Sequence, residues 1–409
     1  MEAYNHYIPY LLIPLITAFI GWFTNLIGIK MILYPVRWVG IGNFIGWQGI
    51  VPRMRVRLTK QLVKNSISVI CTEREMLAAL DEADAIGYIS HMVSPQIEEW
   101  VDDIMEEHTT LYWELSPKPI RAMVYRKVRE QLPELSREIL EDVAQNAERF
   151  INIEEIAAKE AEKNPEIVTN LVTRMAGYEL KLIILSGLFL GFPLGIAQAL
   201  IWYYLPSAWV LPLFGVLVGA GTNWIALQII FKPGEPVNIL GYKLQGIFIK
   251  RQQVVSAQFA DSFTSQFLDV RGLFDYIWKG DNSDEVHRLV RRKIRKIMDK
   301  NRFSSTFDKL MRISGQKTEF DAMTISLVQD RLMRALDQPK VTRKLLEPIN
   351  NLISRRLSAL SPHQFQGLLM PIFESEQWIV ILVGGFLGGA AGTAQLVYLF
   401  GGSFLGFGQ

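Results

Sequence analysis

From Gly21 to Pro35 the chain has the sequence GWFTNLIGIKMILYP, and from Gly219 to Pro233 it has GAGTNWIALQIIFKP. The first glycine, the Thr-Asn pair and the final proline keep the same spacing in both stretches. A second pair, ILSGLFLGFPLGIAQ from residue 184 and ILVGGFLGGAAGTAQ from residue 381, recurs in the same way. Two recurring motifs predict an internal duplication, with repeat 1 at residues 1–205 and repeat 2 at residues 206–409.

Each repeat begins and ends with an apolar segment. A helix needs about 20 apolar residues to cross the hydrocarbon of a bilayer. Segments of this length that carry almost no charge are unusual as buried core hairpins of a soluble protein, so we disfavour that alternative. We expect four transmembrane helices, at residues 7–33, 180–205, 208–231 and 378–400.

Charge predicts the orientation of these segments, because short loops rich in Lys and Arg stay in the cytoplasm. The link at 206–207 and the tail at 401–409 carry no charge. Basic residues instead follow the first and third spans, and six of them suit anionic lipid headgroups. These are Arg53, Arg55, Arg57, Lys60, Lys250 and Arg251. We therefore expect both polar segments in the cytoplasm and both termini outside, with the two halves inserted the same way up.

The polar segments, residues 36–179 and 234–377, are expected to fold into two helical lobes. Apolar residues recur there at spacings of three and four, as in Ile97, Trp100, Val101 and Ile104, and we see no convincing strand alternation. Thr72 and Glu75 have the spacing of a capping box that opens a helix. The predicted fold class is an all-α membrane protein with four transmembrane helices and two helical cytoplasmic lobes.

The two lobes differ in charge. The first polar segment is acidic by about seven charges and the second is basic by a similar amount. The stretch IEEWVDDIMEE from residue 97 aligns with VRRKIRKIMDK from residue 290, so similar apolar positions carry opposite charges. Complementary surfaces that dock would explain this contrast, whereas ordinary solvated faces and a basic helix lying on anionic lipid are the alternatives. The faces are Glu98, Glu99, Asp102 and Asp103 on one side and Arg291, Arg292, Arg295 and Lys296 on the other.

Polar side chains inside the apolar segments need partners, since lipid offers none. We expect bonds between helices, either between the two asparagines or from them to the glutamines. A polar constriction or ion site at the axis is the alternative, although no Asp or Glu within a span supports a proton relay. The residues are Thr24, Asn25, Thr222, Asn223, Gln198 and Gln395.

Glycines spaced four apart lie on one face of a helix and allow another helix to approach closely. Two such ladders indicate tight packing between spans. They are Gly187, Gly191 and Gly195 in repeat 1 and Gly384, Gly388 and Gly392 in repeat 2.

Catalytic signals are scarce in this sequence. The five histidines lack the spacing of metal ligands, and neither a phosphate-binding loop nor a nucleophile elbow is present. The single cysteine, Cys71, excludes an intrachain disulfide. A formal net charge of +2 gives no reason to expect a nucleic-acid partner. We expect no enzymatic activity, no cofactor and no metal.

Three of these motifs carry a family resemblance. They are Gly-x-x-Thr-Asn followed by a proline after the span, Gly-x-Val-Pro-Arg at Gly49–Arg53, and Glu179-Leu-Lys followed by the first glycine ladder and Gln198. Together the motifs resemble the YheB/YjiN-like bacterial integral membrane proteins, the domain-of-unknown-function family number 445. The second half departs from the pattern, since Ile249-Lys250 replaces Pro52-Arg53. The resemblance implies a multi-pass protein of the bacterial plasma (inner) membrane and implies no reaction.

From these features we expect a membrane-anchored scaffold, tether or lipid-surface module with two docking helical lobes. Its partners would be the lipid bilayer, including anionic headgroups, and a second copy or another membrane protein. The alternative is a channel or transporter in which the Thr-Asn helices of both repeats line a central path.

Overall fold

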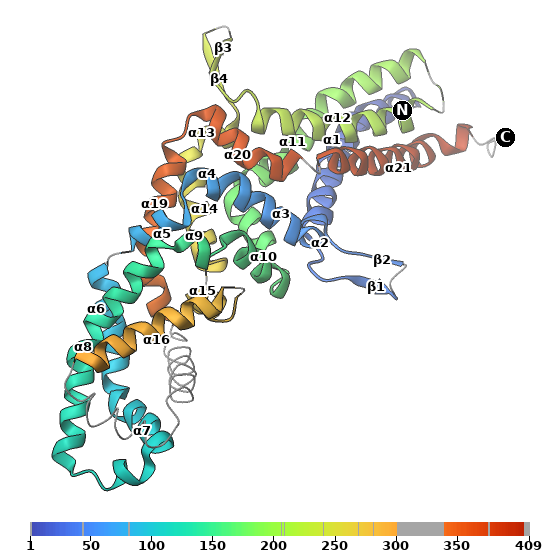
Figure 1. Ribbon diagram of the computed structural model, residues 1–409. Helices are drawn as coiled ribbons and strands as arrows, with labels where there is room; N and C mark the ends of the chain where they lie inside the picture. Colours follow the sequence, from blue (N-terminus) through green and yellow to red (C-terminus); the bar gives the residue numbers. More distant parts are fainter. Residues whose placement is uncertain are drawn as a thin grey trace. The chain divides into compact units, whose positions relative to one another are not determined.

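The computed structural model describes residues 2–404, except for 43–44, 81, 206, 208, 240, 269, 281, 301–338 and 375–376. The described chain is predominantly helical, as predicted (Figure 1). It divides into two compact units. The bundle unit comprises Met1–Ser66, Ala158–Ser262 and Ser354–Gln409, and the lobe unit comprises Ile67–Ala157 and Phe263–Ile353.

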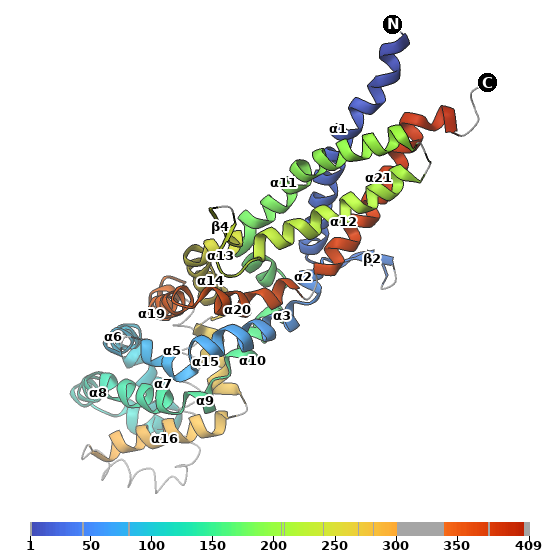
Figure 2. The same ribbon diagram turned by 90° about the horizontal axis from the view of Figure 1, so that it is seen from above.

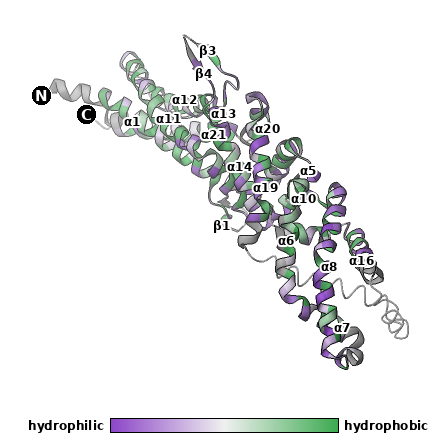
Figure 3. Cartoon of the chain, turned by 90° about the vertical axis from the view of Figure 1, so that its left-hand side faces the viewer, coloured by the Kyte–Doolittle hydropathy of each residue, from purple (hydrophilic) through white to green (hydrophobic). Residues whose placement is uncertain are grey.

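Four helices of the bundle unit are long and apolar enough to cross a membrane, which confirms that part of the prediction. They are α1 (Glu2–Leu33), α11 (Ile167–Tyr204), α12 (Val210–Phe231) and α21 (Gln377–Phe404). Helix α1 packs along α11, and α12 packs along α21 (Figure 2). These helices are largely hydrophobic along their length (Figure 3), and many of their large apolar side chains are exposed.

Two short β-hairpins follow α1 and α12. Strand β1 (Val39–Ile41) pairs antiparallel with β2 (Ile45–Trp47), and β3 (Val237–Ile239) pairs antiparallel with β4 (Tyr242–Leu244). Gly42 and Gly241 adopt positive φ angles of 61° and 82° beside the two turns, a conformation that favours glycine. These strands were not predicted from the sequence, because each has only three residues, which is too short to display an alternating pattern.

Shorter helices complete the bundle unit and connect it to the rest of the chain. They are α2 (Ile50–Arg53), α3 (Arg55–Leu62), the π-helical segment η1 (Val63–Ile67), α10 (Ile153–Lys163), α13 (Ile247–Lys250), α14 (Gln252–Gln266), α19 (Pro339–Ser358) and α20 (Pro362–Glu374). Helices α10, α14 and α19 carry residues of both units.

The lobe unit draws on both polar segments of the sequence. The first segment supplies α4 (Ser68–Ile70), α5 (Glu73–Ala79), α6 (Glu82–Val93), η2 (Ser94–Gln96), α7 (Ile97–Glu114), α8 (Lys118–Gln145) and α9 (Ala147–Phe150). The second segment supplies α15 (Val270–Lys279) and α16 (Ser283–Lys300).

Local signals explain how this unit begins and where its core lies. The predicted capping box is confirmed at the start of α5, where Thr72 Oγ1 accepts from Glu75 N and Glu75 Oε2 accepts from Thr72 N. An apolar cluster forms where α7 packs against α8, because the apolar residues of α7 recur at helical spacing. Its buried members are Val93, Ile97, Trp100, Val101 and Trp113.

Candidate functional site

The first glycine ladder lies directly against the backbone of α1. Gly187 faces Gly21 of α1, and Gly195 faces Pro14. A Cβ added to Gly191 would lie 3.0 Å from both Thr17 O and Ala18 Cα. The ladder therefore sets how closely α1 and α11 approach, because any larger side chain would push the helices apart.

The second ladder does the same between α12 and α21. Gly384 faces Gly219, and Gly388 faces Gly215. Gly392 lies against the backbone of Leu211. All six glycines singled out in the sequence thus lie on contacts between two apolar helices.

The two asparagines of the Thr-Asn motifs make the same contact in both halves of the chain. Asn25 Nδ2 donates to Ile183 O at 2.7 Å, and Asn223 Nδ2 donates to Val380 O at 2.9 Å. Both asparagines are fully buried. Each asparagine joins its own helix to the neighbour that packs against it through glycines. The acceptor in both cases is a backbone carbonyl rather than another polar side chain.

The two threonines bond within their own helices. Thr24 Oγ1 donates to Gly21 O at 3.1 Å, and Thr222 Oγ1 donates to Val218 O at 2.8 Å. Such bonds satisfy a hydroxyl without joining two helices.

The two glutamines differ from each other. Gln198 Oε1 accepts from Thr17 Oγ1 at 2.7 Å. Gly215 occupies the position of Thr17 in the second half, and Gln395 Nε2 is buried without a hydrogen-bond partner among the described residues. The carboxamide oxygens of Asn25 and Asn223 are also buried and unpartnered in that part of the chain. Among the described residues of these polar motifs, three buried atoms therefore make no hydrogen bond.

A buried ion pair, which the sequence analysis did not predict, lies beside the apolar part of α11. Arg251 Nη1 lies 2.7 Å from Glu179 Oε1, and the Glu179 side chain is only 2% exposed. The Arg251 guanidinium also lies over the Tyr178 ring, 4.6 Å from its centroid. The available signal was an acidic residue directly before an apolar span, where it needs a cation. Arg251, which was predicted to contact lipid headgroups, therefore contacts Glu179 and Tyr178 of the protein itself.

The other five basic residues fall into two groups. Arg55 donates to the backbone carbonyls of Ala161 at 2.8 Å and Pro52 at 3.1 Å, so it ties α3 to the end of α10. The remaining four are exposed on the bundle unit. They are Arg53, Arg57, Lys60 and Lys250.

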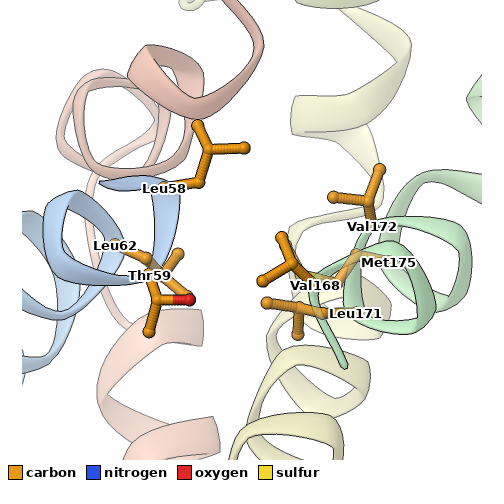
Figure 4. A pocket seen from close by; sticks show the side chains of 7 residues that line it. All are labelled: Leu58, Thr59, Leu62, Val168, Leu171, Val172 and Met175. Atoms are coloured by element: carbon orange, nitrogen blue, oxygen red, sulfur yellow. The ribbon is translucent and has the colours of Figure 1, made fainter. Parts of the chain in front are cut away.

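A small apolar cavity lies between α3 and the first turns of α11 (Figure 4). Its volume is about 10 Å³, room for roughly one water molecule. Ligand pockets are larger by more than an order of magnitude, at about 300–1,000 Å³. We therefore do not assign a ligand to it. Its lining is Leu58, Thr59, Leu62, Val168, Leu171, Val172 and Met175.

In the lobe unit, the acidic face of α7 is engaged by its own polar segment. Asp102 Oδ1 accepts from Trp113 Nε1 at 2.8 Å and from Tyr125 OH at 2.5 Å. Glu98 pairs with Arg129 of α8 at 3.4 Å. Glu99 is exposed and Asp103 is half-buried.

The basic helix α16 packs against α8. Lys293 Nζ lies 2.7 Å from Asp142 Oδ2 and 3.1 Å from Glu138 Oε2, and all three side chains are half-buried. Lys293 was not among the residues of the predicted basic face. Of that face, Arg291 is half-buried and Arg292 is exposed, while the side chains of Arg295 and Lys296 lie outside the described part of the structure.

Further contacts join the two polar segments within this unit. Tyr276 OH donates to Glu155 Oε2 at 2.7 Å, and Arg149 pairs with Glu285 at 3.4 Å. Asn282 Nδ2 donates to Arg149 O. The contact between the two polar segments therefore extends over α15 and α16. Lys293 is the residue there that pairs with two carboxylates.

Two side chains of the lobe unit have shifted proton affinities. Burial, followed by the hydrogen bond to Asp102, raises the pKa of the Tyr125 hydroxyl to about 12. The hydrogen bond to Asp142 raises the pKa of Lys293. Both shifts favour the protonated forms that make the observed hydrogen bonds.

The described residues contain no group of three or more His, Cys, Asp or Glu side chains that could hold a metal ion. Comparison with protein-family models finds no matching family, and comparison with curated proteins finds no match.

Proposed function

We propose that the chain is an integral membrane protein whose four apolar helices span the bilayer. The observation that carries this proposal is the exposure of large apolar side chains along those helices, including Phe19, Phe189, Leu213 and Phe386. Soluble monomers rarely leave apolar patches of this extent in contact with water. Lipid chains would cover them at no cost.

The internal duplication is part of the proposal. It is supported by hydrogen bonds that recur at equivalent positions in the two halves. Gly49 N donates to Pro35 O at 2.9 Å, and Gly246 N donates to Pro233 O at 2.9 Å. The recurring contacts of Asn25 and Asn223 give the same support.

The role we infer is a scaffold or tether that holds a helical lobe unit at the membrane surface. Support comes from the docking of both polar segments within that unit through Lys293 and its two acidic partners. Exposed Arg53, Arg57, Lys60 and Lys250 would face anionic headgroups. Membership of the YheB/YjiN-like family and a place in the bacterial inner membrane belong to this proposal on the motifs quoted above.

A channel or transporter is the second candidate. It is favoured by the unpartnered carboxamide oxygens of Asn25 and Asn223 inside the bundle. Ion flux through vesicles containing the purified chain separates the two candidates. Flux that falls in the Asn25→Leu and Asn223→Leu variants would favour a path, and absence of flux would favour the scaffold.

The membrane proposal is tested by reporter fusions placed after Gln409 and within residues 131–164. Four spans would put both termini on the side opposite the polar segments, and the basic residues that follow α1 and α12 would keep those segments in the cytoplasm. An alkaline phosphatase fusion at the first position should be active, and one at the second should be inactive. Identical activity at the two positions would reject the four-span arrangement.

A further inference from the structure

The first hairpin of the bundle unit has one face made entirely of apolar side chains. The register pairs Val39 with Trp47 and Ile41 with Ile45, which puts these four on one face. Ile41 is 83% exposed and Ile45 is 73% exposed. Val39, Ile41 and Ile45 therefore stand together with little protein over them, while Trp47, 38% exposed, is partly covered.

The opposite face of this hairpin is glycine, and the hairpin covers it with its own side chain. Gly40 pairs with Gly46 there, and a Cβ on Gly46 would lie 2.7 Å from Cζ2 of Trp38. Trp38 Nε1 donates to Gly42 O at 3.0 Å. Trp38 is itself 42% exposed, so the face of Val39, Ile41 and Ile45 is the more open of the two and is the better surface for a partner.

An isolated two-stranded ribbon is marginally stable in water at best, and needs another element against its hydrophobic face. Three-residue strands give little backbone pairing of their own. Covering Ile41 and Ile45 would supply the missing stabilisation.

The hairpin is fixed at the end of a proposed span. Trp47 Nε1 donates to Met31 O, in the last turn of α1, at 3.2 Å. A Cβ on Gly49 would meet Tyr34 N at 2.7 Å and Leu33 C at 2.8 Å. The base of the hairpin is therefore held at the level where α1 would leave the hydrocarbon.

The second hairpin has the same placement after α12. Its register pairs Val237 with Leu244 and leaves Asn238 paired with Lys243 on the other face. Val237 and Leu244 are exposed. Figures 2 and 3 show the two hairpins leaving the bundle on opposite sides, near the ends of α1 and α12.

We propose that both hairpins lie in the headgroup and upper acyl region of the leaflet where α1 and α12 end, with their apolar faces turned into the lipid. This rests on the proposed membrane insertion of the four helices. Trp and Tyr beside a basic residue, as in Tyr34, Arg37, Trp38 and Trp47, are typical of that layer. Burial of an apolar face by several ångströms there is the usual mode of interfacial binding.

A second copy of the chain is a weaker candidate for the cover. A stable protein interface buries about 800 Å² on each partner. Four side chains on a hairpin of two three-residue strands fall well short of that area. Lipid needs no complementary surface, and it is already adjacent at the end of the span.

The test places a nitroxide label at Ile41→Cys in a Cys71→Ala background, in the full chain reconstituted into phosphatidylcholine–phosphatidylglycerol vesicles. Electron paramagnetic resonance then compares collisions of the label with oxygen, which partitions into lipid, and with a water-soluble nickel chelate. Phe189→Cys, on the outer face of α11, is the lipid reference, and Leu115→Cys, which is 75% exposed in the lobe unit, is the water reference. Ile45→Cys and Leu244→Cys repeat the measurement on the first and second hairpins.

We expect an oxygen-to-nickel ratio at Ile41, Ile45 and Leu244 several-fold above that at Leu115 and below that at Phe189. A water-like ratio at the hairpins with a lipid-like ratio at Phe189 would overturn the hairpin inference alone. A water-like ratio at Phe189 as well would reject the membrane proposal. Spin–spin broadening at Ile41 that disappears on dilution with unlabelled chain would assign the cover to a second copy, and would also overturn the inference.

Discussion

The carboxylate of Glu179 is almost completely buried at the point where α11 becomes apolar, and Arg251 is its charged partner. A buried charge that loses its partner costs far more than an exposed one, because the remaining charge keeps its desolvation penalty. The Arg251 side chain is about a quarter exposed, so water would recover part of that cost.

We expect Glu179→Gln to lower the free energy of unfolding by about 3 kcal/mol, at the lower end of the range for a broken buried pair. Asp261→Asn is the matched control in the same unit, since Asp261 meets Arg174 at 3.4 Å with both side chains more than half exposed. Exposed pairs are worth about 0–1 kcal/mol. Thermal unfolding in detergent measures both variants, and equal melting temperatures would contradict the special role of Glu179.

Tyr125 makes the stability of the lobe unit depend on alkaline pH. Its pKa of about 12 lies above the ordinary value of 10.0, first because of burial and then because of its hydrogen bond to Asp102. The raised value means that the unfolded chain loses the proton first. The contribution of Tyr125 is therefore complete below pH 10 and is lost as the pH rises from about 10 to 12.

We expect the wild-type chain to lose more stability than Tyr125→Phe between pH 9 and pH 11. The phenylalanine keeps the ring against Trp113 and removes the titrating group. Denaturant unfolding at each pH, monitored through α-helical circular dichroism, gives the difference between the two chains. Parallel pH profiles would show that the Tyr125 hydroxyl is not protected by Asp102.

At the scale of elements, the contact between α1 and α11 depends on small residues. A Cβ on Gly191 would lie 3.0 Å from the backbone of α1, whereas a Cβ on Gly177 of the same helix would meet nothing within 4 Å. The same substitution at these two glycines therefore separates the cost of overpacking the helix contact from the gain in helix propensity.

We expect Gly191→Leu to destabilise the bundle by about 1–3 kcal/mol, the usual cost of overpacking a tight contact. Gly177→Leu should be neutral or stabilising by up to about 1 kcal/mol, because leucine favours the helix over glycine. Leu190→Ala, one residue away, should cost less than Gly191→Leu. Thermal unfolding in detergent ranks the stabilities of the three variants. A Gly191→Leu chain as stable as the wild type would contradict a role for Gly191 in the packing of α1 against α11.

Sequence patterns identified the four apolar helices and the glycines that lie between them, because length, charge and spacing are all visible in the chain. The partners of Asn25 and Asn223 were not predictable in the same way. Every residue has a backbone carbonyl, so no pattern marks Ile183 or Val380 as an acceptor. The two hairpins were not predicted because their strands have only three residues, and because one face of the first hairpin is glycine.

At the scale of the molecule, the opposite charges of the two polar segments led to the hypothesis that the aligned helices α7 and α16 meet. Alignment of the two proposed repeats matches equivalent positions, but helices that dock against each other need not be equivalent. Lys293 of α16 meets Glu138 and Asp142 of α8, and Glu98 and Asp102 are engaged within the first segment. The opposite net charges of the two polar segments could be predicted from composition. Which acidic helix contacts α16 depends on how the first segment folds.

Substitutions on α16 distinguish the observed contact of Lys293 with α8 from docking through the exposed basic face of α16. Lys293→Glu would place a third acid beside Glu138 and Asp142, whereas Arg292→Glu changes an exposed neighbour on the same helix. Hydrogen bonds between charged groups are worth about 1.5–3 kcal/mol. We expect hydrogen–deuterium exchange of residues 283–300 to become about tenfold faster or more in Lys293→Glu, since 1.4 kcal/mol corresponds to a factor of ten.

Lys293→Glu combined with Glu138→Lys and Asp142→Lys should restore slow exchange, because the charges are then complementary again with their positions reversed. Arg292→Glu should exchange like the wild type. The effect of Lys293→Glu should change little between 0.1 M and 1 M salt, since partly buried pairs are screened much less than exposed ones. If Arg292→Glu accelerated exchange and Lys293→Glu did not, docking would depend on the exposed face of α16 predicted from the repeat alignment, and the Lys293 contact would be incidental.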